Sequence, residues 1–541
     1  MERTKIKFSR IISDSISLPY TADPAEAFEI MRKKLCRFVQ VNRSVSYSVY
    51  RRSVDARRKD DIRFVYTILA ESAEGFKADP ERISKEGFRI DDTVDLNFEV
   101  GTNKSSYRPI VVGCGPAGMF AALVLAEQGY KPILIERGEC LTKRISSVES
   151  FFNTGLLNTE SNVMFGAGGA GTFSDGKLVT RINDPLGRYV INRLLDFGAP
   201  SEIAYMAKPH IGTDLLQGVV SNLLDRVLNC GGDIYYNCLL NSIVENDDGS
   251  VTAKTSLGDF CGSSIILAIG HSARDTYTYL NNNGYSMIAK PFSVGIRIEH
   301  LREDIERGLY GNHAGDPLLG AAEYALSDTK NGRGVYTFCM CPGGEVIAAS
   351  SEEGGLVVNG MSRHARNGLN SNSAVAVSIR PDDYDGTPMG AVEYQRNLER
   401  KAFALGSGKF AAPIELLGDF LRGKSSSLKS PDRIYPTYTR GCFKVADISE
   451  IFPSYVNEEL RYGFKSFAKK LPGFDAPDAV MTAVESRTSA PIRMLRDECG
   501  IALGKNSVYP CGEGAGYAGG ITSAAVDGIR TAIAVMKRFA P

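Results

Sequence analysis

A run of glycines after a short apolar segment is the part of the sequence best suited to bind a phosphorylated ligand. Gly113, Gly115 and Gly118 have the spacing G-x-G-x-x-G. They follow the apolar run Ile110–Val112 and open an apolar stretch that starts at Pro116. In a strand-turn-helix unit, the first glycine permits a tight turn, the second lets the backbone approach a pyrophosphate, and the third allows close helix packing. Because the N-terminus of such a helix also binds phosphate, the spacing predicts a dinucleotide site.

Glu136 is the acidic residue that this motif requires at the end of its second strand. It follows the apolar run Ile133–Ile135, where a carboxylate can accept hydrogen bonds from both ribose hydroxyls. The same charge would repel a 2′-phosphate, so NADP is not expected at this site. Two further matches to the pattern, which begin at Gly166 and Gly514, lack a following strand that ends in an acidic residue. They are not predicted to be independent dinucleotide turns.

Two later segments have the features of a flavin site. Ala268-Ile269-Gly270 ends a buried apolar run, and Glu513 precedes the glycine-led stretch Gly519-Gly520-Ile521. The pair resembles the later motifs of glutathione-reductase-type flavoproteins. In such proteins the C-terminal helix points the positive end of its dipole at the flavin ring, which stabilises reduced flavin. The resemblance implies FAD, with Glu513 standing where these proteins usually carry an aspartate near the ribityl phosphate.

The cysteines and histidines form no recognisable metal or disulfide motif. The 11 cysteines show no C-x-x-C spacing and the five histidines no ligand spacing, so neither a metal site nor a disulfide reductase is predicted. Cys339 and Cys341 would alternate sides on a strand, so we expect them to point apart and to pack in the interior. His271 follows the Gly270 turn and is a candidate to lie beside the cofactor, although a purely structural histidine is the favoured interpretation.

Four arginines in the second half of the chain are candidates for binding an anionic substrate. Arg363 and Arg366 flank His364, and Arg487 and Arg493 lie in the segment VESRTSAPIR. Facing the flavin, they could clamp a carboxylate through paired hydrogen bonds. Salt bridges are the competing interpretation, and the favoured one. The candidate substrate contacts are Arg363, His364 and Arg487, and no catalytic acid or base is assigned because the flavin itself performs hydride chemistry.

An α/β fold is needed to position these residues. Strand, glycine turn, helix and strand over residues 110–135 form a βαβ start, which predicts a parallel sheet. Short alternating runs over residues 232–267 predict a β-meander that returns to this sheet, with turns at DDGS and LGDF. A charged helix is expected over Glu458–Lys470. The predicted fold is a Rossmann-like, glutathione-reductase-type FAD domain with an inserted α+β substrate domain and a small N-terminal α+β module.

The N-terminal module is expected to have the order βαββ and to carry a basic hairpin. Its helix is predicted over Pro24–Val39, capped by Asp23. The hairpin has basic residues at Arg51, Arg52, Arg57, Arg58, Lys59 and Arg63, and acidic residues at Asp55, Asp60 and Asp61. Because the acids are interleaved, a solvated face is favoured over an anion or RNA site. The predicted domains are 1–100 for this module, 105–290 and 500–541 for the FAD domain, and 291–499 for the insert.

The overall composition is that of a globular protein without net charge. The 541 residues include 63 Lys+Arg and 63 Asp+Glu, which argues against a surface that coats nucleic acid. Scattered cysteines and the charged start MERTKIKFSR predict a cytoplasmic protein. Residues 109–126 carry no charge and reach the length of a membrane span, but their glycines favour a strand, a turn and a helix start instead.

A series of motifs extends the resemblance over nearly the whole chain. In order they are NVMFGAGGAGTFSDGKL, KPHIGTD, AIGHSARDTY, FCMCPGG, NGMSRHAR, VESRTSAPIR and YPCGEGAGYAGG. Together they resemble a bacterial family of FAD-dependent, or NAD/FAD-utilising, dehydrogenases, most of which have no assigned substrate. The resemblance implies an FAD domain interrupted by a substrate domain. The glycine-rich segment Gly166–Lys177 is expected to bring backbone N–H groups to the pyrophosphate or flavin, as similar loops do in related flavoproteins.

The predicted cofactor contacts combine these motifs. They are Gly113, Gly115, Pro116, Ala117, Gly118, Glu136, Arg137, Gly169, Gly171, Thr172, Leu240, Gly270, His271, Gly512, Glu513, Gly519, Gly520 and Ile521.

We therefore expect an FAD-dependent oxidoreductase that transfers a hydride between flavin and an unidentified small molecule. NADH or NADPH remains open as a transient electron donor. One alternative is a flavin-dependent RNA-modifying enzyme, and another is an FAD-binding regulatory protein that contacts its partner through the basic hairpin. Zero net charge and interleaved acids disfavour both. No membrane association is expected, and the sequence defines no oligomeric state.

Overall fold

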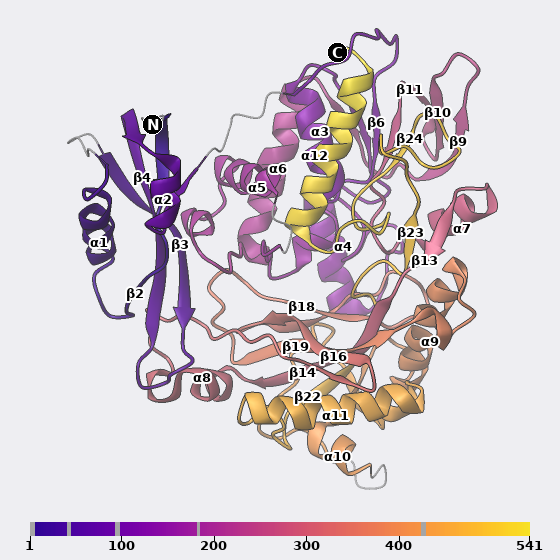
Figure 1. Ribbon diagram of the computed structural model, residues 1–541. Coiled ribbons are helices and arrows are strands. Elements are labelled where there is room, and N and C mark those ends of the chain that lie inside the picture. The colour runs from indigo at the N-terminus through magenta and orange to yellow at the C-terminus, as the bar shows by residue number, and fades with distance from the viewer. Residues whose placement is uncertain (1–5, 40–44, 92–97, 181–183, 424–428) are drawn as a thin grey trace. The chain divides into compact units, whose positions relative to one another are not determined.

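The protein is described by a computed structural model, shown in Figure 1. It describes residues 6–39, 45–91, 98–180, 184–423 and 429–541. The chain divides into two compact units. The first contains Met1–Asn97, Pro200–Pro209 and Glu306–Ala322, and the second contains Phe98–Ala199, His210–Ile305 and Glu323–Pro541.

The first unit is built on a five-stranded antiparallel sheet. The order is β2-β4-β1-β5, and β3 also pairs with β4. Its elements are β1 (Ile6–Ile12), β2 (Ile16–Pro19), α1 (Ala25–Leu35), β3 (Val45–Asp55), β4 (Arg63–Ala78), α2 (Pro80–Lys85) and β5 (Arg89–Ile90). The predicted βαββ order lacks β2, α2 and β5. These elements are only 4, 6 and 2 residues long, too short to give a periodic signal.

The hairpin between β3 and β4 carries the basic cluster predicted from the sequence. Its ends are in register, with Asp55 opposite Arg63. Three arginines of the turn contact neighbouring aspartates, in the pairs Arg57–Asp55 at 2.5 Å, Arg58–Asp60 at 3.5 Å and Arg63–Asp61 at 3.3 Å. The guanidinium of Arg52 lies 4.9 Å from the ring centre of Phe64. The aspartates thus neutralise much of the positive charge of the turn.

The second unit contains a five-stranded sheet whose strands are all parallel, in the order β24-β12-β6-β7-β8. The strands are β6 (Ile110–Val112), β7 (Ile133–Ile135), β8 (Asp233–Tyr235), β12 (Ile265–Leu267) and β24 (Val508–Pro510). β6, β12 and β24 are buried along their whole length, as expected for a parallel sheet covered on both faces. The parallel pairing of β6 with β7 confirms the predicted βαβ start.

Two helices that are distant in sequence lie side by side next to this sheet (Figure 1). They are α3 (Pro116–Glu127), which is almost entirely buried, and α12 (Ile521–Arg538). A Cβ atom added at Gly528 would lie 2.1 Å from the carbonyl oxygen of Ala117, so the two helices touch backbone to backbone. The uncharged stretch 109–126 forms β6, the glycine turn and α3. No helix in the described part of the chain combines the length and apolar character that a membrane span needs.

The predicted meander is split between two sheets. β8 and β12 join the parallel sheet, whereas β9 (Leu240–Glu245), β10 (Val251–Thr255) and β11 (Gly258–Gly262) form a separate antiparallel sheet. The sequence LGDF was expected to be a turn, but most of it enters β11. The physical reason is a tighter reversal at Ser256 and Leu257, in which the Thr255 hydroxyl donates to the carbonyl oxygen of Gly258 at 2.7 Å.

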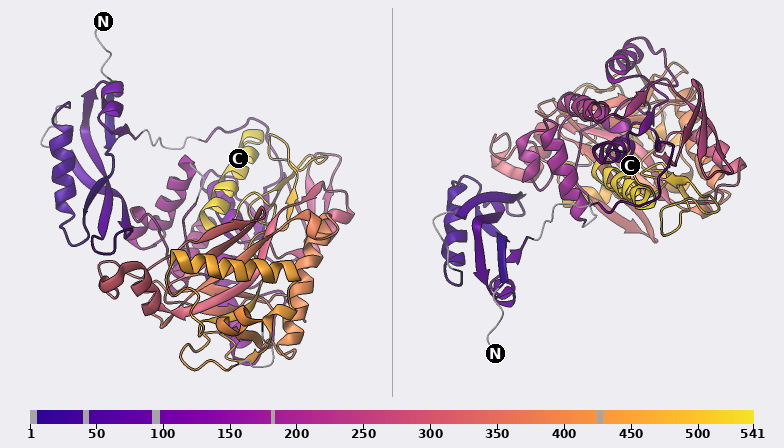
Figure 2. Two further views of the ribbon diagram at one scale, coloured as in Figure 1. Left: turned by 60° about the horizontal axis from the view of Figure 1, so that its bottom comes forward. Right: turned by 90° about the horizontal axis from the view of Figure 1, so that it is seen from above.

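A seven-stranded sheet forms the core of the segment predicted to be the insert. Its order is β15-β16-β19-β14-β22-β20-β21. The strands are β14 (Phe292–Leu301), β15 (Ser327–Lys330), β16 (Arg333–Cys341), β19 (Asn370–Ile379), β20 (Ala412–Leu416), β21 (Phe443–Val445) and β22 (Val480–Glu485). Helix α11 (Ser454–Lys470) lies across β15, β16 and β19, as Figure 2 shows, and contains the helix predicted over Glu458–Lys470.

The remaining elements connect these sheets. The helices are α4 (Leu141–Thr154), α5 (Pro185–Asp196), α6 (Thr213–Asn229), α7 (Arg274–Asn282), α8 (Arg302–Tyr310), α9 (Pro388–Leu405) and α10 (Leu417–Arg422). The strands are β13 (Met287–Ala289), β17 (Glu345–Ala348), β18 (Val358–Met361) and β23 (Ile492–Met494). Short 3-10 turns lie at Ala170–Phe173, Ser201–Ala204, Gly311–His313, Pro381–Asp383 and Ile448–Glu450.

Candidate functional site

A cavity of about 340 Å³ lies at the carboxyl ends of the parallel strands in the second unit. Gly113, Glu136, Ala268 and Glu513, which follow strands β6, β7, β12 and β24, all line it. Open α/β sheets bind their ligands in the crevice outside the carboxyl ends of the strands. Its wall also includes residues of β16 and β18 from the segment predicted to be the insert. The parallel sheet and strands of the predicted insert therefore contribute to one site.

Most residues predicted from the sequence to contact cofactor or substrate line this one cavity. They are Gly113, Gly115, Pro116, Ala117, Glu136, Arg137, Gly169, Gly171, Leu240, Gly270, His271, Arg487, Glu513, Gly519, Gly520 and Ile521. They come from segments far apart in the chain.

The glycine turn is shaped by close backbone contacts. Gly113 has φ of +101°, and a Cβ atom there would lie 2.3 Å from the carbonyl oxygen of Ala268. A Cβ atom at Gly118 would lie 1.8 Å from the carbonyl oxygen of Gly113. Gly115 instead faces Gly169, whose own Cβ would meet the Gly115 backbone at 2.7 Å. Since both Gly115 and Gly169 line the cavity, a ligand can approach the backbone closely here.

Glu136 ties three parts of the site together. Its Oε2 accepts a hydrogen bond from the backbone N–H of Cys114 at 2.7 Å, and its Oε1 accepts from Gly138 at 2.8 Å and Gly166 at 3.0 Å. The side chain is 5% exposed and reaches the cavity wall. A carboxylate has about four acceptor sites, so it retains capacity for a ribose hydroxyl beside these three bonds. The structure therefore adds a scaffolding role to the predicted one.

Arg144 holds the glycine-rich loop beside Glu136, and sequence reasoning missed it. Its guanidinium is completely buried and donates to the backbone carbonyl oxygens of Asn162, Val163, Gly166 and Ala167. Burial lowers the pKa of Arg144 to about 10, which leaves it charged at neutral pH. On α4 it occupies an ordinary amphipathic position, so nothing in its local sequence marks it.

The start of α12 supplies a second helix N-terminus to the cavity. Gly520 is the N-cap residue and no side chain caps it, and Gly519, Gly520 and Ile521 all line the cavity. Glu513 lies on the same wall. Burial raises the pKa of Glu513 to about 7, although the positive charge of Lys290 partly offsets this effect.

His271 lies on the cavity wall, where its Nδ1 is 2.9 Å from the hydroxyl of Ser272. Burial and the positive charges of Arg487 and Arg274 together lower the pKa of His271 to about 4. The ring is therefore neutral at physiological pH.

Three predicted cofactor residues serve the packing around the cavity instead of lining it. Gly118 packs the start of α3, and the N–H of Gly512 donates to the Asp527 carboxylate at 2.7 Å. Thr172 is fully buried, and its carbonyl oxygen accepts a hydrogen bond from the Thr213 hydroxyl at 2.8 Å.

The structure also places Arg363 and His364 outside the cavity. Arg363 is exposed. The ring of His364 stacks on His210 with centroids 5.2 Å apart, and its Nδ1 lies 3.0 Å from the carbonyl oxygen of Ile211. This segment is held in place because it packs tightly on Gly212, where a Cβ atom would lie 2.2 Å from the His364 nitrogen.

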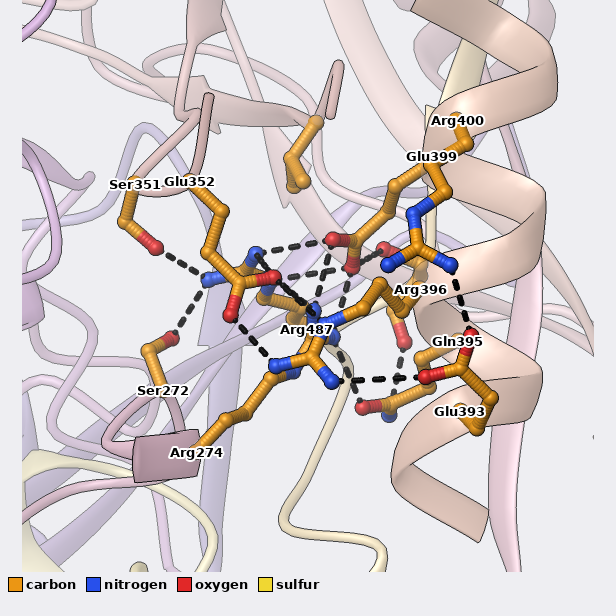
Figure 3. A network of polar contacts seen from close by, with 12 residues as sticks. Ser272, Arg274, Ser351, Glu352, Glu393, Gln395, Arg396, Glu399, Arg400 and Arg487 are labelled. Atoms are coloured by element: carbon orange, nitrogen blue, oxygen red, sulfur yellow. Dashed lines mark hydrogen bonds and ion pairs between the residues drawn. The ribbon is translucent and has the colours of Figure 1, made fainter. Parts of the chain in front are cut away.

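Arg487 reaches the cavity, but the protein's own groups already bind its guanidinium (Figure 3). Its Nε and Nη2 donate to Glu399 at 3.0 and 2.8 Å, and its Nη1 donates to the hydroxyls of Ser272 and Ser351. Glu399 of α9 also accepts two bonds from Arg274 of α7. Burial alone would raise the pKa of Glu399, but the two arginines lower it overall. The cluster joins α7, α9 and the segment after β22, and only Arg487 was singled out from the sequence.

Two charged residues and one cysteine on the cavity wall were not predicted to form part of the site. Asp175 and Lys177 form an ion pair at 2.7 Å, and Arg366 also binds Asp175, at 2.5 Å. Cys339 of β16 lies on the same wall. In the described parts of the chain, no group of three or more His, Cys, Asp or Glu side chains is arranged to hold a metal ion.

Comparison with known proteins assigns the chain to a family. It is 43% identical over 516 residues to an uncharacterized protein of Clostridium beijerinckii (strain ATCC 51743 / NCIMB 8052), covering 94% of this chain and 96% of that protein. The chain belongs to the family of this clostridial protein. Residues 291–488 match the family model "FAD-dependent protein, C-terminal domain-like", and residues 12–71 match a domain of unknown function (DUF8436). FAD is the cofactor of this protein.

Solved structures resemble the chain only distantly. The tetracycline destructase Tet(55) is 9% identical with a TM-score of 0.34, covering 79% of each chain. CtdE in complex with FAD is 12% identical with a TM-score of 0.31, covering 80% of this chain and 84% of that one. At this level of likeness, the function has to be argued from the family and from the residues of the cavity.

The cavity has the features that FAD requires. The uncapped N-terminus of α3 provides N–H groups for a diphosphate, and Gly115 and Gly169 leave the backbone open beside it. Glu136 has acceptor capacity for a ribose, and the start of α12 offers a second positive helix end. The donors and acceptors present therefore fit the cofactor.

Proposed function

We propose that this protein is an FAD-dependent oxidoreductase that transfers a hydride between the flavin and a small molecule admitted from the side of the insert. The observation that carries the proposal is the shared cavity. Gly115 and Glu136 from the parallel-sheet region line it, and so do Phe338 and Asn359 from strands of the predicted insert. Such an arrangement supports a glutathione-reductase-type FAD domain, formed by residues 105–290 and 500–541, with residues 291–499 as the substrate domain.

Each part of the wall has a distinct task in this proposal. The N-terminus of α3 binds the diphosphate, and Glu136 holds the adjoining ribose through its remaining acceptor capacity. The backbone at Gly519 and Gly520 directs the positive end of α12 at the flavin ring. Once bound, FAD supplies the hydride chemistry itself.

The charged residues of the wall are held in fixed positions by the protein. Lys177 is paired with Asp175, and burial would lower its pKa, but neighbouring carboxylates raise it overall. It therefore remains a cation at the cavity. Arg487 cannot turn freely toward a substrate because Glu399 binds it through two nitrogens. We propose that Arg487 fixes the cavity wall, so that substrate anions would meet Lys177 in its place.

The electron donor is proposed to be a nicotinamide nucleotide that binds transiently. No strand-turn-helix unit besides the one at Gly113 predicts a second dinucleotide site, so the donor would reach the flavin through the open cavity. Flavin hydroxylases provide a precedent for a donor without its own Rossmann domain.

The test is an anaerobic titration of the purified protein with NADH and with NADPH. The flavin is first released and identified as FAD, and its absorbance is then followed during each addition. Fast bleaching by either nucleotide is the expected result. A protein that remains colourless after incubation with excess FAD would overturn the cofactor assignment and the function together. Bound FAD that neither nucleotide reduces would overturn the nicotinamide step alone.

A further inference from the structure

The end of β16 departs from regular strand geometry at Cys339. In a regular strand Cys339 and Cys341 would flank Met340 and point the same way relative to the sheet, with neighbours alternating. Here the register with β19 shifts between Phe338 and Cys341, and Cys339 has φ of +44°. A non-glycine residue rarely adopts this left-handed conformation, and such backbone strain is concentrated at functional sites.

The irregular strand end brings the two cysteines into contact, contrary to the expectation that they point apart. The thiol of Cys341 is buried and donates to the carbonyl oxygen of Cys339 at 3.3 Å. A hydrogen bond between the two side chains is the largest influence lowering the pKa of Cys339, against the opposing effect of burial. The same contact, together with burial, raises the pKa of Cys341. Both cysteines are free, and the opposite pKa shifts favour a thiolate at Cys339 beside a thiol at Cys341.

Two cations, Arg297 and Lys177, act electrostatically on Cys339. Arg297 is fully buried within the seven-stranded sheet and donates through Nη1 to the carbonyl oxygen of Cys339 at 2.8 Å. Lys177 approaches from the glycine-rich segment, and both cations lower the pKa of Cys339. Two carboxylates oppose them: Asp175 acts to raise this pKa, and Glu485 binds Arg297 at 2.7 Å. A thiolate is stabilised by neighbouring positive charge, which is the usual environment of reactive cysteines.

Cys339 also lines the cavity that contains the predicted FAD contacts, together with Lys177, Gly115 and Ile521. We propose that Cys339 and Cys341 form a redox thiol pair that delivers two electrons to the FAD in this cavity. The inference deepens the proposed function and rests on it for the electron acceptor. Because the spacing is C-x-C, a sequence search for C-x-x-C does not detect the pair.

The proposed step balances in atoms and charge. The Cys339 thiolate bonds to the sulfur of Cys341, and the S–H bond of Cys341 breaks. The new S–S bond forms as two electrons leave the sulfurs, and these electrons pass to FAD with the proton released from Cys341. In the opposite direction, the same pair would be reduced from its disulfide form.

The first experiment tests the bond itself and does not depend on turnover. The purified protein is treated with diamide, denatured, alkylated with iodoacetamide and digested, and the peptide that contains residues 339–341 is analysed by mass spectrometry. We expect it to carry an internal disulfide in the wild type and to carry none in Cys339→Ser or Cys341→Ser. Cys261→Ser is the matched control, since this exposed cysteine lies on β11, and it should retain the disulfide.

The second experiment tests electron transfer to the flavin. After diamide treatment, each protein is titrated anaerobically with dithionite and the electrons taken up per FAD are counted. The wild type and Cys261→Ser should take up about twice as many electrons as Cys341→Ser, because a flavin and a disulfide each accept two. Cys341→Ala is a second variant in case the serine at this buried position impairs folding.

Two outcomes would overturn the inference. A wild-type protein that binds FAD but forms no 339–341 disulfide would overturn the thiol pair while leaving the proposed function intact. A disulfide whose presence does not change the electron uptake would overturn the transfer to FAD. If the purified protein binds no FAD, the proposed function itself is wrong, and the thiol pair has no electron acceptor. The measured flavin content distinguishes this outcome from the two above.

Discussion

The carboxylate of Glu136 accepts the backbone N–H of Cys114 at 2.7 Å, which joins the end of the second parallel strand to the turn after the first. Residues proposed to bind the cofactor are therefore also bound to one another. Loss of this carboxylate would loosen the glycine turn as well as remove a ligand contact. The relationship distinguishes Glu136 from acidic residues that touch only the ribose.

Glu136→Gln should weaken FAD binding by roughly 10- to 100-fold, because a hydrogen bond to a charged group contributes about 1.5–3 kcal/mol. An amide also places an NH2 group against one of the three N–H donors that Glu136 accepts. The dissociation constant is measured by titrating flavin-free protein with FAD and following flavin fluorescence. Glu149→Gln, at an exposed position on α4, is the control and should bind FAD like the wild type. Equal affinity of Glu136→Gln and the control would contradict the assigned role.

Gly118→Ala should unfold at a clearly lower temperature and purify with little flavin. The added Cβ would lie 1.8 Å from the Gly113 carbonyl oxygen, so the turn and α3 would have to separate. Gly218→Ala is the matched control, because this glycine lies within helix α6 with no atom within 4 Å of an added Cβ. Alanine there should stabilise the protein by about 0.5–1 kcal/mol. Thermal unfolding followed by circular dichroism compares the two, and a tolerated Gly118→Ala would refute the packing argument.

Glu399→Gln should destabilise the second unit by about 3–5 kcal/mol, since it removes the carboxylate that two buried arginines share. Arg274 and Arg487 would remain buried after losing this partner. Glu393→Gln, on the same helix, removes a carboxylate whose side chain is 44% exposed and should cost no more than about 1 kcal/mol. Urea unfolding gives the free energy of unfolding of each variant. If the two substitutions cost the same, the buried cluster does not hold the cavity wall together.

Stability should depend on Glu513 between about pH 4.5 and 7. The pKa of Glu513 is raised in the folded protein from 4.5 to about 7, so over this range the folded state binds more protons than the unfolded state. By linkage, the stabilising contribution is fully present below pH 4.5 and is lost as the pH rises through 7, by up to about 3 kcal/mol. The measurement is the melting temperature of flavin-free wild type and Glu513→Gln from pH 5 to pH 8. The wild type should lose stability relative to the variant as the pH rises, and parallel curves would rule out the raised pKa.

The sequence predicts the local parts of the site better than the parts assembled over long range. Gly113, Gly115 and Glu136 form one βαβ unit, so spacing and flanking apolar runs are sufficient to locate them. Arg144 lies nearby, but its hydrogen-bond partners are backbone carbonyl oxygens. Since every residue has such an oxygen, no sequence pattern marks these partners. The contribution of Arg144 therefore appears only when the loop is seen folded around its guanidinium.

Arg487 and Cys339 show why the parts of the site assembled over long range could not be predicted. The partners of Arg487 are Glu399 and Arg274, and no local pattern relates a residue of α9 to one of α7. The prediction that Cys339 and Cys341 point apart was wrong, because residues two apart share one face of a regular strand. The register shift after Phe338 arises from pairing with β19 and could not be predicted either. Periodicity predicts the strand but not the bulge, because a bulge is a property of two strands together.

The close packing of α12 against α3 also has a consequence for synthesis. A ribosome makes the apolar helix α3 early, and α12, which covers it at Ala117, emerges only after nearly the whole intervening chain. During that interval the nascent polypeptide exposes the apolar surface of α3, and only part of its nucleotide pocket has formed. Chaperone engagement should therefore begin with α3, and flavin capture should follow translation.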